Sequence, residues 1–514
     1  MLTRKPYDQL MSEFDWALPE RLNMADQVCD AWAAYAPDQP AIIDLTQDLQ
    51  SVSYAQLQHL SWRVQATLYD RGLVPGDRVG VLLSQGPLCA AAHIAIWRAG
   101  AISVPLFKLF KHDALTSRVS LARIDQVVTD NEGRRMLEGL PVVCMCEHDL
   151  PAVASVQPNH DTRSEDPAVI IFTSGTTGAP KGALHAHRVL TGHLPGVEIS
   201  HDFLGQPDDC LWTPADWAWI GGLFDVLMPG LALGVPVVAA RMAKFSTEDC
   251  IRICQQGSVR NVFFPPTSLR MLKADDVAIS GLRSVASGGE PLGSEMLDWG
   301  RRAFGLTINE FYGQTECNMV ASSCSTLFDP TPGAIGKAVP GHRVSVIDAT
   351  GSETSDEGDI AIARGSASMM LGYWDNPQET RTKFRGDWML TGDRGRLEEN
   401  TLVFVGREDD VITSAGYRIG PAEIEDCLLT HPAVATVGVV GKPDLLRTQI
   451  VKAYVVIKPD ARVSVSDLQN WVKERLATYL YPREIQFLDA LPMTVTGKVI
   501  RKELRARAAA EAVV

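Results

Sequence analysis

The sequence predicts an α/β protein with at least two domains, and three observations support this. The chain has 514 residues, more than one hydrophobic core usually organises. Strand-like and helix-like segments alternate through its first part, which is typical of a layered α/β body. After about Gly333 the pattern changes to short strands and then to a compact tail. We therefore expect a large layered α/β N-terminal domain with a β-rich subdomain, plus a small α+β C-terminal domain.

The clearest βαβ unit covers residues 78–107. Residues Arg78–Gln85 read as a strand, Gly86–Gly100 as a helix that ends in glycine, and Ala101–Phe107 as the next strand. This spacing is typical of two parallel strands joined by a crossover helix. The same alternation returns over residues 237–266, where Ser246 and the acidic residues after it predict the start of a helix.

The second half of the chain predicts the domain boundary. Short strands with turns begin near residue 334, and the strand Thr401–Gly406 ends in the charged run 407–410. A new domain-sized pattern follows, so we predict an N-terminal body over 1–408 and a small domain over 409–514. The tail is expected to contain, in order, a helix at 423–432, strands at 434–440 and 450–457, a helix at 465–480, a strand at 484–488 and a basic terminal helix.

Charge and composition restrict the function. The net charge of −14 argues against a general nucleic-acid surface, although a locally positive cleft can still hold an anion. No segment approaches the roughly 20 apolar residues of a membrane span, and the first residues lack the apolar core of a signal peptide. The ten cysteines do not show zinc-site spacing. We expect a cytoplasmic protein with reduced, mostly buried thiols.

A glycine- and hydroxyl-rich loop follows an apolar strand at residues 173–182. It contains three glycines, four hydroxyl side chains and one lysine. Glycine lets backbone N–H groups converge on an oxyanion, hydroxyls donate to phosphate oxygens, and Lys181 adds a positive charge. It is not a Walker A loop, because Lys181 lies between Pro180 and Gly182. From composition alone, a phosphate site and an ordinary surface loop are equal alternatives.

Further motifs follow this loop in order along the chain. They are SGGEP (287–291), YGQTE (312–316), TGD (391–393), GREDD (406–410), GYRIG (416–420) and PMTVTGK (492–498). Together with TSGTTGAPKG (173–182), they resemble the signatures of the adenylate-forming superfamily, which includes acyl-CoA synthetases, luciferases and the adenylation domains of peptide synthetases. The resemblance spans nearly the whole chain.

The resemblance implies an ATP-dependent acid–thiol ligase. In this family a carboxylate attacks the α-phosphate of MgATP to give acyl-AMP and pyrophosphate, and the acyl group then passes to the thiol of coenzyme A. ATP, Mg²⁺ and coenzyme A are therefore the implied cofactors, and a small carboxylic acid is the implied partner. No nucleic-acid partner or membrane span is expected, and an assembly of identical chains is left open.

The resemblance also implies roles for individual residues. The residues implied to bind the phosphates are Thr173, Ser174, Gly175, Thr176, Thr177, Gly178 and Lys181. Those implied to bind the rest of the nucleotide or coenzyme A are Gly288, Gly289, Glu290, Pro291, Tyr312, Gly313, Gln314, Asp393, Arg407, Gly416 and Arg418. The remaining roles are contact with the α-phosphate, Mg²⁺ binding, the hinge between domains and the catalytic lysine of the mobile domain, and they fall to Thr315, Glu316, Asp409 and Lys498, respectively.

The identity of the acid is predicted less sharply. The segment implied to line the acyl pocket contributes Trp217, Trp219, Ile220, Gly221 and Phe224, with Gly313 beside it. In acetate-activating relatives a tryptophan occupies the position of Gly313, so glycine favours a medium-chain fatty acid. Acetate, propionate and aromatic acids are left open, and core packing is the alternative role for one tryptophan.

Two rival functions are also left open. The pair Phe224–Asp225 is similar to the Phe-Asp of amino-acid-activating domains, whose aspartate binds the ammonium group of the substrate. A nucleotide sensor without catalysis could use the same fold, since a fold does not establish a function. Such a sensor would not need Lys498 or Glu316, and both are present.

Overall fold

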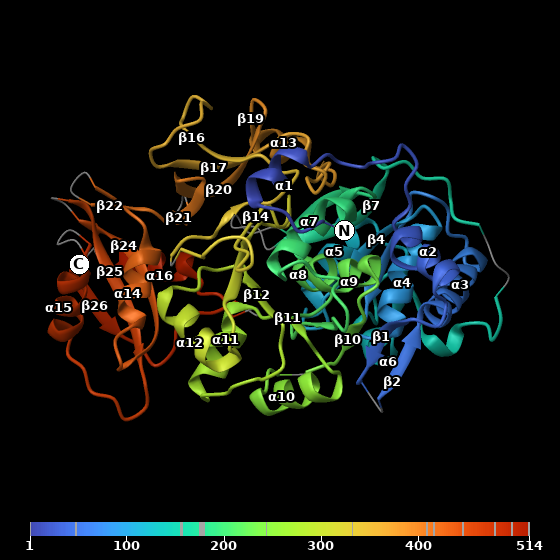
Figure 1. The fold of residues 1–514 in the computed structure, drawn as a ribbon, viewed down its shortest axis with the longest axis horizontal. Coiled ribbons are helices and arrows are strands. Elements are labelled where there is room, and N and C mark those ends of the chain that lie inside the picture. The colour runs from blue at the N-terminus through green and yellow to red at the C-terminus, as the bar shows by residue number, and fades with distance from the viewer. Residues whose placement is uncertain are drawn as a thin grey trace.

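The computed structural model describes residues 2–46, 49–154, 158–173, 180–242, 244–331, 333–407, 410–414, 417–444, 447–476, 480–494 and 497–511. The described strands form four sheets. Figure 1 shows them along one long axis, with the C-terminal sheet at one end beside α11 and α12 (Pro266–Ala274 and Ser294–Phe304).

The seven-stranded sheet contains the predicted βαβ unit. Its strands, in spatial order, are β18 (Gly372–Tyr373), β8 (Lys181–Ala186), β7 (Pro167–Thr173), β4 (Ile102–Pro105), β3 (Arg78–Leu82), β5 (Gln126–Thr129) and β6 (Val143–Met145). Strands β3 and β4 are parallel and are joined by α4 (Pro87–Arg98), as expected. Pro87 stands at the first turn, where its missing N–H costs nothing, and ten of the twelve helical residues are buried. The remaining helices of this part are α1 (Tyr7–Glu13), α2 (Ala31–Tyr35), α3 (Tyr54–Asp70), α5 (His112–Ala122) and α6 (Asn131–Met136).

The nine-stranded sheet contains the second predicted unit. Its strands, in spatial order, are β15 (Lys337–Ala338), β14 (Ala321–Ser322), β13 (Ile308–Tyr312), β12 (Ser284–Gly288), β11 (Asn261–Phe263), β9 (Leu211–Trp212), β10 (Val237–Ala239), β1 (Pro40–Asp44) and β2 (Gln50–Ser53). The predicted helix is α10 (Thr247–Gln256), and the hydroxyl of Ser246 accepts the Asp249 N–H as its cap. The largest buried cluster includes residues from both large sheets. The helices α7 (Val189–Ser200), α8 (Ile220–Gly222) and α9 (Met228–Leu233) precede β10, with a π-helical turn at Leu223–Leu227.

A β-rich part follows, as the sequence predicts. Its sheet contains β16 (Val344–Ile347), β17 (Gly358–Ala363), β20 (Trp388–Glu398), β19 (Phe384–Arg385) and β21 (Thr401–Arg407). Between β17 and β20 the chain returns to the seven-stranded sheet through β18, and α13 (Pro377–Thr382) leads back from it. Residues 373–383 therefore connect the seven-stranded sheet to the sheet of the β-rich part.

The C-terminal sheet is mixed, with most strand pairs antiparallel. It contains β23 (Tyr417–Ile419), β22 (Ile412–Ser414), β25 (Thr448–Ile457), β24 (Val434–Asp444) and β26 (Glu484–Phe487), accompanied by α14 (Pro421–Leu429), α15 (Val465–Arg475) and α16 (Arg501–Ala510). The expected elements of the tail are thus present, α15 being shorter than the predicted 465–480. The division at 408/409 stays a prediction, because residues 408 and 409 lie outside the described residues.

Two further sequence predictions concern the burial of the cysteines and the length of the apolar helices. All ten cysteines are free thiols, and all except Cys144 are buried, which confirms that prediction. Among the described residues, no helix is both long and apolar enough to cross a bilayer.

Candidate active site

The predicted phosphate loop joins two antiparallel strands. Thr173 ends β7 and Lys181 begins β8, and the two residues are register partners. The Thr173 hydroxyl donates to the Lys181 carbonyl at 3.4 Å. Ser174, Gly175, Thr176, Thr177 and Gly178 lie outside the described residues, so their predicted phosphate contacts stay predictions.

The Lys181 ammonium has an anionic partner that the sequence analysis missed. Its Nζ lies 2.6 Å from Oε2 of Glu379, which is on α13, and 5.7 Å from the ring centroid of Tyr373. Lys181 is only 20% exposed, whereas Glu379 is 40% exposed. A phosphate at this position would compete with Glu379 for the lysine.

Two residues that are predicted to bind the nucleotide, Tyr312 and Asp393, lie next to each other. Tyr312 ends β13, and its hydroxyl donates to Oδ2 of Asp393 at 2.5 Å. Asp393 on β20 is the register partner of Arg407 on β21, and their side chains lie 3.6 Å apart. Burial raises the pKa of Asp393, while nearby Arg407 opposes that rise. Three residues from different motifs thus converge around one buried carboxyl group.

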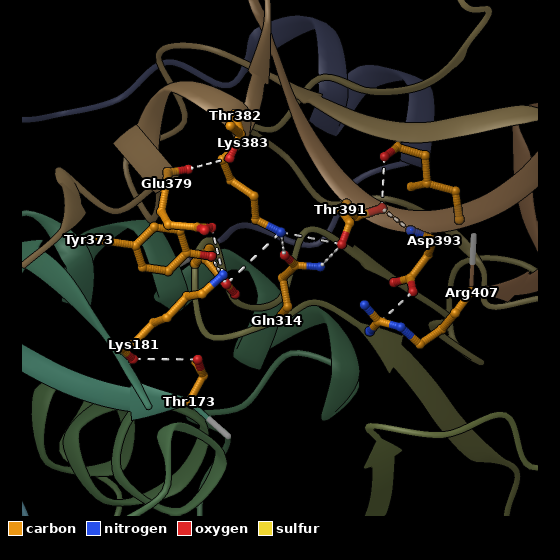
Figure 2. Close-up of polar contacts among 12 residues, drawn as sticks. Thr173, Lys181, Gln314, Tyr373, Glu379, Thr382, Lys383, Thr391, Asp393 and Arg407 are labelled. Atoms are coloured by element: carbon orange, nitrogen blue, oxygen red, sulfur yellow. Dashed lines mark hydrogen bonds and ion pairs between the residues drawn. The ribbon is translucent and has the colours of Figure 1, made fainter. Parts of the chain in front are cut away.

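The YGQTE segment is held by Lys383, as Figure 2 shows. The Lys383 ammonium donates to Oε1 of Gln314 at 2.8 Å and to the Thr391 carbonyl at 3.3 Å. Gln314 Nε2 donates to the same Thr391 carbonyl at 3.0 Å. These contacts fix Gln314 against the TGD turn that carries Asp393.

Glu316 is nearly buried, and its carboxylate has two neighbours. The Tyr373 hydroxyl donates to Oε1 of Glu316, and the Lys383 Nζ lies 3.9 Å from the same oxygen. Burial, and then the Glu316 charge, raise the pKa of Tyr373, so its hydroxyl remains a proton donor. Thr315, the predicted α-phosphate contact, is half-buried just before Glu316.

Lys498 reaches the large body from the C-terminal part of the chain. Its Nζ donates to the Gly289 carbonyl at 3.0 Å, and the Thr267 hydroxyl donates to the Gly497 carbonyl at 3.4 Å. Gly289 has a φ of 99°, a conformation that favours glycine. Lys498 also acts electrostatically to lower the pKa of Asp393. The structure therefore brings the predicted lysine to the predicted nucleotide residues.

The other residues of the SGGEP motif lie at the end of β12. Gly288 is the last residue of that strand, and a Cβ there would meet the ring of Phe311 at 2.4 Å. Glu290 accepts a hydrogen bond from Arg270 at 2.7 Å, and Pro291 follows it. Glu290 is thus engaged by α11 in this structure.

The two tryptophans of the predicted acyl pocket differ in burial. Trp217 is fully buried in the largest core cluster, which favours the alternative of core packing for this tryptophan, and its role in a pocket wall stays a prediction. Trp219 is half-buried and packs edge-on against Phe107 and Phe110, with centroids 5.2 and 6.3 Å away. Phe224 is fully buried against His193. Trp219 is therefore the better candidate for a pocket wall.

Gly313 does not face open space. A Cβ at this position would lie 2.4 Å from the carbonyl carbon of Asn318 and 2.6 Å from the Met319 nitrogen. The expectation that glycine here leaves room for a longer acyl chain is therefore wrong for this direction, because backbone fills it. By contrast, a Cβ at Gly221 would meet only the Phe263 ring, at 3.1 Å, and Asp225 Oδ2, at 3.6 Å. Ile220 is half-buried beside it.

The predicted hinge and coenzyme A residues lie largely outside the described part of the chain. Asp409 and Gly416 lie outside the described residues, and Arg418 is described only as part of β23. Their assigned roles stay predictions.

The arrangement can bind an anionic nucleotide and stabilise negative charge. Lys181 supplies a cation from β8 and Lys498 supplies one from the C-terminal part, while Asp393 offers acceptors suited to hydroxyl groups. No cluster of three or more His, Cys, Asp or Glu side chains that could hold a metal is found in the described part of the chain. Glu316 would offer a magnesium ion a carboxylate oxygen, the ligand type that hard cations prefer.

Comparisons with known proteins place these features in a family. The family model for AMP-binding enzymes matches residues 29–374, and that for the AMP-binding enzyme C-terminal domain matches residues 423–498. The mitochondrial acyl-coenzyme A synthetase ACSM3 of Mus musculus is 30% identical over 97% of this chain and 93% of its own. The acetyl-coenzyme A synthetase of Bacillus subtilis is also 30% identical, over 98% of this chain and 95% of its own.

A solved structure supports the same assignment. The anthranilate CoA ligase AuaEII in complex with anthranoyl-AMP superposes with a TM-score of 0.88, covering 97% of this chain and 99% of that one, at 25% identity. The matched length includes both the large body and the C-terminal part. The chain therefore belongs to the adenylate-forming family of AMP-binding enzymes and, within it, to the ATP-dependent acyl-CoA synthetases.

Proposed function

We propose that this synthetase activates a medium-chain fatty acid. The carboxylate attacks the α-phosphate of ATP, which gives acyl-AMP and releases pyrophosphate. The thiol of coenzyme A then attacks the acyl carbonyl carbon, which gives the thioester and releases AMP. The observation that carries the adenylation chemistry is the hydrogen bond from Lys498 to the Gly289 carbonyl, which joins the C-terminal part to the large body. There Lys498 also acts electrostatically on Asp393, the partner of Tyr312.

In the proposed reaction, each charged side chain has a separate task. Lys181 would bind the β- and γ-phosphates after leaving Glu379, and Lys498 would neutralise the charge that builds up between the carboxylate and the α-phosphate. Asp393 would accept hydrogen bonds from the ribose hydroxyls. Glu316, oriented by Tyr373, would be the protein ligand of Mg²⁺. When bound, that ion would supply positive charge that offsets the negative charge of the phosphates.

An aromatic cluster near the predicted acyl pocket bears on the chain length of the acid. Trp219, Phe107 and Phe110 form an apolar cluster that suits a hydrocarbon chain. This cluster favours acids longer than acetate, whereas the similarity to the acetyl-coenzyme A synthetase of Bacillus subtilis and to the anthranilate ligase keeps short-chain and aromatic acids as alternatives.

An amino-acid substrate is disfavoured by the surroundings of Asp225. This carboxyl group is fully buried, and burial raises its pKa well above the ordinary range. The side-chain amide of Asn318 donates to it, and no cation among the described residues pairs with it. Because burial disfavours the charged form of this carboxyl group, it is a weaker partner for the ammonium group of an amino acid than an exposed carboxylate.

A panel of acids tests the proposal. Pyrophosphate release is measured with acetate, butyrate, hexanoate, octanoate, decanoate, dodecanoate, benzoate and a mixture of amino acids, with and without coenzyme A. Each methylene group that becomes buried adds about 0.8 kcal/mol, so kcat/KM is expected to rise about fourfold per methylene toward a medium-chain optimum. A maximum at acetate or benzoate would replace the medium-chain assignment. Exchange with amino acids alone would identify the other chemistry, and ATP binding without acid-dependent AMP release would indicate a sensor.

A further inference from the structure

A cavity of about 380 Å³ lies where the seven-stranded sheet meets the β-rich part. Its walls come from Leu18, from Glu165 and Arg188 at the ends of β7 and β8, from the connection 364–371, and from residues 380–384 of α13 and β19. Figure 1 shows α13 and β19 next to each other in this region. Small-molecule sites typically occupy about 300–1,000 Å³, so the cavity is large enough for a small ligand.

The lining of this cavity carries excess positive charge in a chain whose net charge is −14. Three arginines line it, against the single carboxylate of Glu165. Arg188 has a structural role, because its Nε donates to Glu165 at 2.6 Å and its guanidinium donates to the carbonyls of Ala367 and Met369 at 2.6 and 2.8 Å. The charge of Arg188 is thereby neutralised, which leaves two arginines to account for.

Arg364 and Arg381 have no carboxylate partner among the residues that the structure describes. The Arg364 guanidinium lies 3.8 Å from the ring centroid of Phe384, and its Nε makes only a long hydrogen bond, 3.4 Å, to the Gly386 carbonyl. In the described part of the chain, the Arg381 side chain has no hydrogen bond or ion pair. Both side chains are exposed, so their planar guanidinium groups can bind an oxyanion without losing an existing ion pair.

Part of the cavity lining is apolar. Ala367, Met369 and Met370 are buried, and Leu18 and Leu371 extend the same apolar surface. Methionine side chains adapt to ligands of different shape. We propose that this cavity binds a small amphipathic anion, with a carboxylate or phosphate head on Arg364 and Arg381 and a short hydrocarbon chain against the methionines.

This site is separate from the proposed ATP site but shares its supporting segments. The Met370 N–H donates to the Glu316 carbonyl at 2.8 Å, so the cavity wall and the YGQTE segment are bonded through backbone. Helix α13, which carries Arg381, also carries Glu379, the partner of Lys181. A ligand in the cavity would contact these segments without contacting the side chains of Glu316 or Lys181.

Calorimetric titration of the full-length protein tests the proposal. The probes are hexyl phosphate, hexanoate, inorganic phosphate and hexanol, and the proteins are the wild type, the double variant Arg364→Gln/Arg381→Gln, and the control Arg252→Gln on α10. We expect hexyl phosphate, hexanoate or both to show a saturable site that weakens about tenfold or more in the double variant and is unchanged in the control, since each lost charge-assisted hydrogen bond is worth about a factor of ten. Hexanol and inorganic phosphate should bind at least tenfold more weakly than the amphipathic probe.

The outcomes are distinct. A loss confined to hexanoate or to hexyl phosphate identifies carboxylates or phosphate esters as the class of ligand. Equal affinity of the wild type and the double variant for both amphipathic probes overturns the proposal. Equal affinity for inorganic phosphate or for hexanol also overturns it, because the site then lacks one of its two parts. Since both arginines are exposed, unchanged melting temperatures should accompany the substitutions.

Discussion

Glu316 has its carboxylate held by residues from the short segment 373–383. Tyr373 donates a hydrogen bond to it, and Lys383 both approaches it and binds Gln314 of the same motif. These neighbours restrict the carboxylate to one orientation before any ligand arrives, which favours a metal or phosphate partner in a fixed place. Tyr373 and Lys383 are therefore positioning residues for the proposed reaction.

The substitution Tyr373→Phe tests this positioning role. It removes the hydroxyl that binds Glu316 and keeps the ring that packs near Lys181. A hydrogen bond to a charged group contributes roughly 1.5–3 kcal/mol, so kcat/KM for MgATP should fall by about tenfold or more, with a matching rise in the Mg²⁺ concentration for half-maximal rate. Steady-state kinetics over a Mg²⁺ series provide the measurement. The exposed residue Tyr35 supplies the control, Tyr35→Phe, and an unchanged Mg²⁺ dependence in Tyr373→Phe would contradict the role.

The sequence identified one half of this site and missed the other for a physical reason. Asp393 and Glu316 stand in compact motifs, so local pattern is enough to find them. Tyr373 and Lys383 lie in a stretch of mixed composition, and their contacts with residues 57 and 69 positions away depend on how β18 joins the seven-stranded sheet. Chain pairing at that distance leaves no local signal in one sequence.

Strand β13 carries Tyr312 of the candidate active site at its end and the buried carboxyl group of Glu310 within it. Tyr312 ends the strand at the site, while Glu310, two residues earlier, is buried and accepts the Leu292 N–H at 3.0 Å. Burial raises the pKa of Glu310 to about 8. At neutral pH this side chain is therefore mainly protonated in the folded protein, and ionised in an unfolded chain.

Glu310→Gln should change how stability depends on pH. Between the ordinary pKa of 4.5 and about 8, the folded wild type binds a proton that the unfolded chain does not, so its stability falls as pH rises through this window. The loss is on the order of a few kcal/mol. Glutamine keeps the oxygen acceptor and does not titrate, so the variant should gain stability relative to the wild type from pH 5 to pH 8. Thermal unfolding at both values provides the measurement, and parallel pH profiles for the two proteins would refute the assignment.

The burial of single residues within elements was predictable only in part. The apolar run at residues 87–98 correctly predicted the helix α4. Nearly every side chain of this helix is buried, so the apolar pattern alone was enough to find it. Trp217 and Trp219 have almost the same sequence environment, yet one is fully buried in the core and the other is half-buried. The difference depends on the packing of two sheets, which a sequence pattern does not contain. The surroundings of Gly313 could not be predicted either, because they depend on where the backbone of residues 318 and 319 lies.

The two lysines proposed to act on the phosphates come from different parts of the molecule. Lys181 belongs to the seven-stranded sheet, whereas Lys498 belongs to the C-terminal part and contacts the large body at Gly289. A chain with a net charge of −14 can attract ATP to such a site because the local field is set by nearby charges. The resemblance to the adenylate-forming family implies that both lysines act on one nucleotide, and this stays a prediction. The structure places Lys498 against the large body at Gly289.

If the small domain carries Lys498 into the site for one step only, the two half-reactions must respond differently to its loss. Adenylate formation needs the lysine to neutralise charge at the α-phosphate, whereas thioester formation from acyl-AMP does not. Such a change between the steps would require the C-terminal part to move, a common device in enzymes with two successive reactions.

The variant Lys498→Ala, assayed separately in both half-reactions, tests this account most directly. Two lost charge-assisted hydrogen bonds correspond to about a hundredfold or greater loss, so exchange between ATP and pyrophosphate should fall by at least that factor. Conversion of supplied acyl-AMP and coenzyme A to thioester should stay within about twofold of the wild type, and the exposed control Lys502→Ala should change neither. An equal loss in both half-reactions, or full adenylate formation without Lys498, would contradict the account.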